Sequence, residues 1–205
     1  MYYAVYNNRM SNQAFRNVML ASERCSVSFF MGYARARRDL SVPADICVFE
    51  LSDRPRAMAN ILGHFIQTGS DLLVYVEPEV AAWHPRTIER VMQAMSAAKA
   101  FSVVSVSMDV IVADELRPDR ESETTLSPLG TGPLTPMLAM TSSAVNALYN
   151  RNVDLMTEGY GGKGHAFDVF SPMHHGNKML AEDAAFSERC RKAGLPIFYL
   201  GEKAR

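Results

Sequence analysis

The amino-acid sequence predicts an α/β fold in which a mostly parallel central sheet lies between two layers of helices. Short apolar segments typical of buried strands alternate along the chain with longer segments whose apolar residues recur at helical spacing. These helical segments are long enough to form right-handed crossovers between parallel strands. Because ligands in such sheets bind at the carboxyl ends of the strands, we look for candidate site residues there.

The overall composition is that of an ordinary soluble globular protein. The chain has 205 residues, of which 48% are hydrophobic and 21% are charged. This length predicts a single domain over residues 1–205. The formal net charge of −1 gives no broad basic field for nucleic acid or for an anionic membrane.

The sequence favours a cytoplasmic protein. No apolar run reaches the length of a membrane span, and the N-terminal segment lacks the pattern of a secretory signal. The three cysteines, Cys25, Cys47 and Cys190, show no metal-like spacing. We therefore expect them to be reduced, buried thiols.

In the N-terminal part, the pattern predicts a strand at 2–6 and then a helix that Ser11 caps. Apolar residues at helical spacing extend this helix to residue 22. Two further strands, at 26–31 and 45–51, are joined by a basic segment.

The next helix has the clearest signals. Ser52 or Asp53 can cap it, Pro55 suits its first turn, and it ends near 67–70. Its apolar stripe consists of Met58, Ile61, Leu62 and Phe65. The most hydrophobic strand follows at 71–76, and Pro85 opens another helix.

The C-terminal half contains more irregular sequence. Residues 115–133 read as a polar loop, and residues 157–179 form a long segment without periodicity, rich in glycine, histidine and aromatic residues. Such segments are usually functional or disordered. The regular elements expected here are strands at 101–114, 134–140 and 197–200, and helices at 142–149 and about 181–193.

The first candidate site follows the strand at 71–76. Glu77 and Glu79 flank Pro78 at a predicted carboxyl end of the sheet. Their carboxylate oxygens suit a hard divalent cation. Taken alone, the pair is explained equally well as a metal-binding edge or as the polar end of a strand.

A second pair of acids opens the last helix. Glu182 and Asp183 lie four and three residues before Phe186, so both lean toward the inward face of the helix. The helix dipole favours acids in a first turn by about 0.3–1 kcal/mol, which is a purely structural explanation. The alternative is that they line the entrance to a pocket, next to the glycine- and histidine-rich segment.

Three segments together resemble small GT-A-type glycosyltransferases related to glycosyltransferase family 2, which are common in bacteria and phages. "DRPRAMANILGHFI" (53–66) resembles the family's helix that carries Arg and Asn, and 71–94 resembles its strand, acidic motif and Pro-led helix. The segment 164–201, with "FDVF" and "AED", resembles the closing block of the family in order and spacing.

The resemblance implies a three-layer GT-A-like fold that binds a nucleotide-diphospho-sugar. Residues 1–114 would form the nucleotide-sugar-binding half, and residues 115–205 the acceptor and catalytic half with flexible loops. The expected reaction transfers a sugar to a hydroxyl acceptor with inversion at the anomeric carbon, with a carboxylate as general base. The acceptor stays open among a glycan, a lipid-linked sugar, a protein and a modified DNA base.

The resemblance also implies roles for the two acidic pairs. Glu77 and Glu79 stand where the family has Asp-x-Asp, which holds Mg²⁺ or Mn²⁺ against the donor diphosphate. Glu182 and Asp183 stand at the adjacent-acid motif, in which Asp183 takes the position of the general base. A carboxylate there can remove the acceptor proton as the anomeric carbon gains positive charge.

Residues on the helix at 53–66 are candidates for donor contacts. Asp53 could accept hydrogen bonds from the base or ribose. Arg56 and Asn60 share a face opposite the apolar stripe, where they either contact donor phosphates or are solvated. For the acceptor or the base, candidate stacking surfaces in the 157–179 segment are Tyr160, Phe167 and Phe170.

The chain departs from the family at several positions. Glutamate replaces aspartate in the strand-end motif, and no histidine follows the last strand as a third metal ligand. His174 or His175 could substitute, or they could be solvated. A non-catalytic binding or assembly subunit is therefore an alternative. A nucleotidyltransferase is another, but it would need a glycine-rich basic loop after the first strand, which residues 6–13 do not supply.

Overall fold

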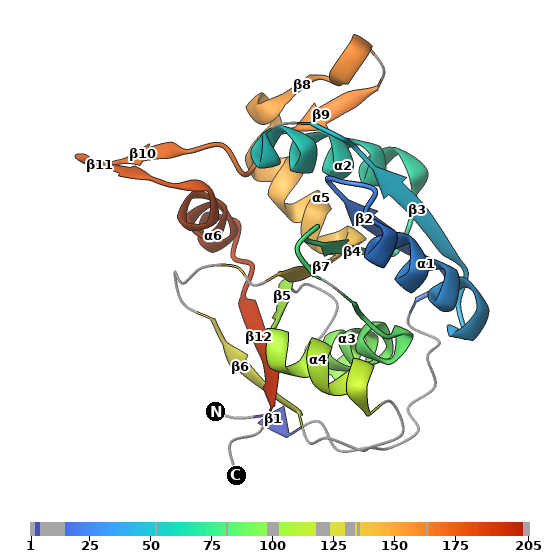
Figure 1. Ribbon diagram of the computed structural model, residues 1–205. Coiled ribbons are helices and arrows are strands. Elements are labelled where there is room, and N and C mark those ends of the chain that lie inside the picture. Colours follow the sequence, from blue (N-terminus) through green and yellow to red (C-terminus); the bar gives the residue numbers. More distant parts are fainter. Residues whose placement is uncertain are drawn as a thin grey trace.

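The computed structural model describes residues 3–4, 15–51, 53–80, 82–97, 103–117, 124–129, 134, 136–162 and 164–202. In these ranges, eight strands form one mixed sheet in the order β1-β6-β12-β5-β7-β4-β2-β3 (Figure 1). Its strands are β1 (Tyr3–Ala4), β2 (Val18–Ser22), β3 (Ala44–Val48), β4 (Leu72–Val76), β5 (Val103–Val106), β6 (Thr124–Pro128), β7 (Met137–Thr141) and β12 (Ile197–Glu202). The helices are α1 (Val27–Asp39), α2 (Arg54–Thr68), α3 (Pro85–Ala97), α4 (Met108–Leu116), α5 (Ser142–Arg151) and α6 (Glu182–Lys192).

The sheet is mostly parallel in strand direction, as predicted. β2 pairs in parallel with β3 and β4, and β12 pairs in parallel with β5. β7 runs antiparallel between β4 and β5, so these two neighbours point the same way. β6 is antiparallel to both β12 and β1. Of the eight strands of this sheet in the described ranges, β6 and β7 alone run against the common direction.

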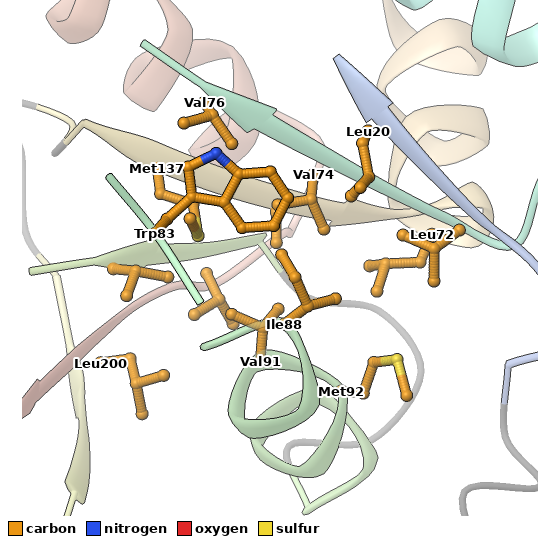
Figure 2. Close-up of a cluster of buried hydrophobic side chains, with 14 of the residues drawn as sticks. Leu20, Leu72, Val74, Val76, Trp83, Ile88, Val91, Met92, Met137 and Leu200 are labelled. Carbon is orange, nitrogen blue, oxygen red and sulfur yellow. The ribbon is translucent and has the colours of Figure 1, made fainter. Parts of the chain in front are cut away.

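Helices cover both faces of the sheet, and each face has its own apolar core. One core combines buried residues of α1, α3 and α4 with those of the sheet, and the other uses α2, α5 and α6. Figure 2 shows part of the first core, where Ile88, Val91 and Met92 of α3 pack against Leu72 and Val74 of β4. The helices and the sheet together form the three layers that the sequence predicts.

Trp83 fixes the chain that follows the Glu-Pro-Glu segment. Its side chain is 1% exposed and lies in the first core, close to Phe29 of α1 at a centroid distance of 6.4 Å (Figure 2). Burying a side chain this large stabilises the fold by a few kcal/mol, so Trp83 fastens the start of α3 to the first core.

The N-terminal elements differ from the prediction. Residues 18–22 form the buried strand β2 rather than a helix, and residues 27–39 form helix α1 where a strand was expected at 26–31. A short apolar run does not distinguish a buried strand from a buried helix by periodicity alone. The expected cap at Ser11 lies outside the described residues.

Two further elements were predicted wrongly. The expected strand at 101–114 is strand only in β5, because Ser107 accepts a hydrogen bond from Val110 N and caps α4. β6 lies within the expected loop at 115–133 and pairs with β12. The elements expected near 45–51, 53–68, 71–76, 85–98, 134–140, 142–149, 181–193 and 197–200 are confirmed.

The glycine-rich segment is more ordered than expected. It contains β8 (Met156–Glu158), a 3₁₀ turn η2 (Tyr160–Gly162), β9 (His165–Phe167), β10 (Met173–His175) and β11 (Lys178–Leu180). β8 pairs with β9, and β10 pairs with β11, so the segment is two short hairpins. The first hairpin lies against α2, and the second leads into α6 (Figure 1).

Two of the three cysteines match the expectation. Cys47 and Cys190 are buried free thiols, and burial raises the pKa of Cys47 to about 12. Cys25 is exposed, because it lies in the loop between β2 and α1. None of the helices in the described ranges combines the length and the hydrophobicity that crossing a membrane requires.

Candidate functional site

The two acidic motifs meet at a single arginine. Arg54, the first residue of α2, places Nη2 at 3.0 Å from Glu77 Oε1 and Nη1 at 3.1 Å from Asp183 Oδ1. Glu182 Oε2 lies at 3.6 Å from the same Nη1. We call these four residues the Arg54 cluster. The structure thus joins residues that are more than a hundred positions apart in sequence.

The backbone around the cluster is held by strand and helix contacts. Glu77 follows β4 directly, and its amide donates to Pro136 O at 2.8 Å next to β7. Asp183 lies in the first turn of α6, and its Oδ2 accepts a hydrogen bond from Leu134 N at 2.9 Å. The helix has no side-chain cap at Ala181, as expected from the absence of serine there. The acids therefore have fixed positions at the carboxyl end of the sheet.

The cluster carries more negative than positive charge. Three carboxylates against one guanidinium leave a formal charge of about −2. The side chains of Arg54, Glu77 and Asp183 are each about a quarter exposed. Burial raises the pKa of Glu77, although Arg54 acts in the opposite direction. Burial alone would lower the pKa of Arg54, but Asp183 and Glu77 outweigh it and hold that pKa above its ordinary value.

Behind the cluster lie two residues that the sequence did not suggest. Tyr75 in β4 is fully buried, and its hydroxyl lies beside Glu23 and Arg54 without a well-formed hydrogen bond to any described residue. Glu23 follows β2, which is the parallel neighbour of β4. Burial raises the pKa of both side chains. Glu23 was missed because β2 was predicted to be helical.

Arg54 was also missed, although the sequence contains the signal for it. The apolar stripe of α2 includes Met58 and Ile61, which point toward the sheet. One turn earlier on the same stripe stands Arg54. An arginine at the start of a buried stripe has to direct its guanidinium to the edge of the sheet, where the strand-end acids lie.

The predicted metal ligands are not gathered around one position. Glu79 is exposed, and it affects Glu77 only as a neighbouring negative charge. His174 and His175 lie on β10, and His175 Nδ1 is 3.3 Å from Glu188 Oε1, further along α6 than the cluster. Among the described residues, no group of three or more His, Cys, Asp and Glu side chains is arranged to hold a metal ion. The position between Glu77 and Asp183 is filled by the Arg54 guanidinium, so these carboxylates do not fit a divalent ion there.

The predicted donor residues line a separate pocket beside the cluster. This pocket has a volume of about 500 Å³ and lies between α2 and the first hairpin. Its lining comprises Asp53, Arg56, Ala59, Asn60, Thr157, Glu158, Gly159, Tyr160, Gly161, Gly162, Ala166, Asp168 and Ser171. We call it the α2 pocket. Because Asp53 and Arg54 are consecutive, the first turn of α2 connects the pocket with the cluster.

Arg56 and Asn60 have different roles in this pocket. Arg56 is exposed and forms no ion pair with another described residue, so its guanidinium can meet an anion. Asn60 is 3% exposed, which rules out a solvated side chain. Its Oδ1 accepts from Tyr160 N at 2.7 Å, and its Nδ2 donates to Arg56 O at 2.8 Å. Asn60 therefore holds the 3₁₀ turn η2 against α2.

The far wall of the pocket is formed by the "FDVF" segment. Asp168 accepts hydrogen bonds from both the amide and the hydroxyl of Ser171, which closes a tight local turn. Arg189 of α6 donates to the carbonyl oxygens of Val169 and Ser171, both at 2.7 Å. The segment is thus fastened from inside the protein, which leaves Asp168 facing the pocket.

The structure corrects two of the three expected stacking residues. Phe167 and Phe170 are at most 1% exposed, and Phe170 stacks on Phe186 at a centroid distance of 4.3 Å. They belong to the core because the segment folds back onto α6. Tyr160 is 57% exposed at the pocket, so its ring remains a candidate for stacking.

Comparisons with known proteins give a fold likeness but no family. No family model matches the chain, and neither does any curated protein. Among solved structures, a candidate nucleotide-diphospho-sugar transferase from Desulfovibrio desulfuricans G20 aligns at 9% identity and a TM-score of 0.45, over 90% of this chain and 79% of that one. A 4-diphosphocytidyl-2C-methyl-D-erythritol synthase from Anaerococcus prevotii aligns at 6% identity and a TM-score of 0.45, over 91% and 89%. A CMP:2-keto-3-deoxy-manno-octonic acid synthetase complexed with CTP aligns at 10% identity and a TM-score of 0.40, over 89% and 87%. At these scores the likenesses add nothing to the assignment of the site.

Proposed function

We propose that the chain is a glycosyltransferase that moves a sugar from a nucleotide-diphospho-sugar to a hydroxyl acceptor with inversion. The observation that supports this proposal is the meeting of Glu77 with Glu182 and Asp183 at the carboxyl end of the sheet. Ligands in α/β sheets bind at this edge. The α2 pocket opens beside it, with a volume that suits a small ligand.

The donor would lie in the α2 pocket. Arg56 offers a guanidinium without an ion pair among the described residues, which suits the diphosphate. Asp53 is an exposed acceptor for ribose or sugar hydroxyl groups, and Tyr160 offers an exposed ring for stacking.

In the proposed chemical step, Asp183 of the Arg54 cluster acts as the general base. The acceptor oxygen attacks the anomeric carbon, the bond from that carbon to the diphosphate oxygen breaks, and the acceptor proton passes to Asp183. The nucleoside diphosphate leaves with the bonding electron pair. Arg54 and Leu134 N hold Asp183 in one orientation, which fixes the direction of proton transfer. Glu182, at the more open side of the cluster, would contact the acceptor.

The loop after β2 argues against the nucleotidyltransferase alternative. Glu23, Arg24 and Cys25 follow the strand, so this loop contains no glycine that would let the backbone approach a triphosphate. In a donor assay, a nucleotidyltransferase would release pyrophosphate from a nucleoside triphosphate, whereas a glycosyltransferase would release a nucleoside diphosphate from a nucleotide sugar. The product therefore separates the two reactions.

The direct test is the variant Asp183→Asn in donor hydrolysis and transfer assays. We expect kcat to fall by about 10²-fold or more, because the amide cannot accept the proton, while the melting temperature stays close to wild type. The matched control is Asp109→Asn, since Asp109 is also an acid in the first turn of a helix but lies on α4. Activity that persists in Asp183→Asn would refute the assignment of the base.

A further inference from the structure

We infer that Arg54 is the resident cation of the cluster and occupies the place that a divalent metal would need to bridge the two acidic motifs. The inference deepens the proposed function and rests on it in one respect, namely that donor binding needs no added metal. Its main test measures metal binding alone and requires no turnover. The two proposals can therefore fail separately.

The contacts show why Arg54 and a bridging metal exclude each other. One terminal nitrogen of the guanidinium contacts Glu77 at 3.0 Å, and the other contacts Asp183 at 3.1 Å. A Mg²⁺ ion needs oxygen ligands at about 2.1 Å in near-octahedral geometry. An ion at that distance from both carboxylates would overlap the guanidinium, so it could enter only if Arg54 left.

Arg54 is not free to leave without cost. Its side chain is 24% exposed, and it would lose its contacts with Glu77 and Asp183. The residue begins the buried stripe of α2, which fixes the direction of the side chain. If the guanidinium withdrew, Glu77 and Asp183 would face each other without a counter-charge, which is unfavourable for partly buried carboxylates.

The same geometry predicts what happens when Arg54 is removed. Glu77, Glu182 and Asp183 would then present three carboxylates around one vacant position, and hard divalent cations bind such oxygen sets. Wild type should therefore not bind Mn²⁺ at this position, whereas a variant without the guanidinium should bind it. If Arg54 is what excludes the metal, removing it restores Mn²⁺ binding. If the carboxylates are unable to bind a metal for another reason, removing Arg54 has no such effect.

The experiment is a Mn²⁺ titration of Arg54→Met and of wild type. Binding is measured from the melting temperature at each Mn²⁺ concentration and from the electron paramagnetic resonance signal of free Mn²⁺. We expect no shift for wild type, and a rise in melting temperature of about 5 °C or more for Arg54→Met once Mn²⁺ exceeds its Kd about 100-fold. Arg35→Met is the matched control, because Arg35 also pairs with a carboxylate, that of Glu115, on a different pair of helices. The double variant Arg54→Met/Glu77→Gln should lose the gain.

Each outcome decides the inference. Wild-type binding of Mn²⁺ that Glu77→Gln abolishes would overturn it, and so would the absence of any gain in Arg54→Met. If Arg54→Met does not fold, Arg54→Gln provides the shorter, neutral replacement, and the wild-type titration still applies. Nucleotide-sugar binding by wild type should be unchanged in EDTA, and a requirement for metal there would contradict the inference even if transfer activity is present.

Discussion

The Arg54 cluster and the α2 pocket share the first turn of α2 but differ in how their charged side chains are paired and in construction. In the cluster, every functional side chain has a charged partner, and the residues follow strand and helix ends. In the pocket, Arg56 lacks an ion pair with the described residues, and one wall is the 3₁₀ turn η2, which a single asparagine holds. Under the proposed function, the cluster orients the proton acceptor, and the pocket receives the donor.

The largest expected effect is that of a substitution at Gly63 of α2, where the first hairpin, which lines the pocket, packs closely against the helix. A Cβ at this position would lie 1.8 Å from the backbone oxygen of His165 in β9, so the first hairpin must move away from α2. We expect Gly63→Ala to destabilise the protein by about 3 kcal/mol and to weaken donor binding. Chemical denaturation measures the loss of stability, and calorimetry with the donor measures the loss of binding. Hydrogen exchange of the first hairpin shows whether the hairpin has moved away from α2.

Gly32→Ala provides the matched control for this change. A Cβ there would meet the Trp83 ring at 2.2 Å, on the opposite face of the sheet. It should destabilise the fold without increasing exchange in β8 and β9. Equal exchange in both variants would show that the hairpin does not depend on α2 packing.

The second effect concerns the charge balance of the cluster. Arg54→Met should cost about 2 kcal/mol at pH 8, because it leaves partly buried carboxylates without their counter-charge. Burial already raises the pKa of Glu77, and loss of Arg54 should raise it further. The folded variant then holds a proton that the unfolded chain releases, so the penalty is present above the folded pKa and decreases as the pH falls through it.

Denaturation of wild type and Arg54→Met at pH 8 and pH 5 measures this dependence. The deficit of the variant should be clearly smaller at pH 5. Arg35→Met removes a more exposed ion pair and should cost at most about 1 kcal/mol at either pH. A deficit that is equal at both pH values would contradict the electrostatic explanation.

The smallest effect on stability is expected at Arg56, in the open pocket. Arg56→Ala should change the free energy of unfolding by less than about 0.5 kcal/mol, because the side chain is exposed. Donor affinity should fall about tenfold or more, since a hydrogen bond to a charged group is lost. Calorimetry with the donor tests this, with Arg37→Ala on α1 as an exposed control.

Much of the fold was predictable because the central elements carry several concordant signals. Residues 53–76 combine a proline in the first turn, an apolar stripe, a glycine just past the last turn and a buried strand. The structure confirms the helix and the strand in this order, although Asp53 makes no side-chain capping hydrogen bond. The segment that forms β2 and α1 contains only short apolar runs, without a proline or glycine that marks where an element begins or ends. A helix was therefore predicted where β2 lies and a strand where α1 begins, and Glu23 was not identified as a candidate site residue.

The candidate site was predictable in location but not in its contacts. Strand-end and helix-start patterns identified Glu77, Glu182 and Asp183, and these three residues do lie together. A sequence does not state which side chain fills the space between two motifs a hundred residues apart. That information comes from packing, and it assigns the space to Arg54 and places Asn60 in a backbone contact.

The most direct test of the account is a thermal-shift panel of nucleotides and nucleotide sugars at millimolar concentration, with Mn²⁺ and with EDTA. The account predicts that at least one UDP- or GDP-sugar raises the melting temperature by several degrees in both conditions. It also predicts that hydrolysis of this donor depends on Asp183. If no nucleotide and no nucleotide sugar raises the melting temperature in either condition, the proposed function is wrong.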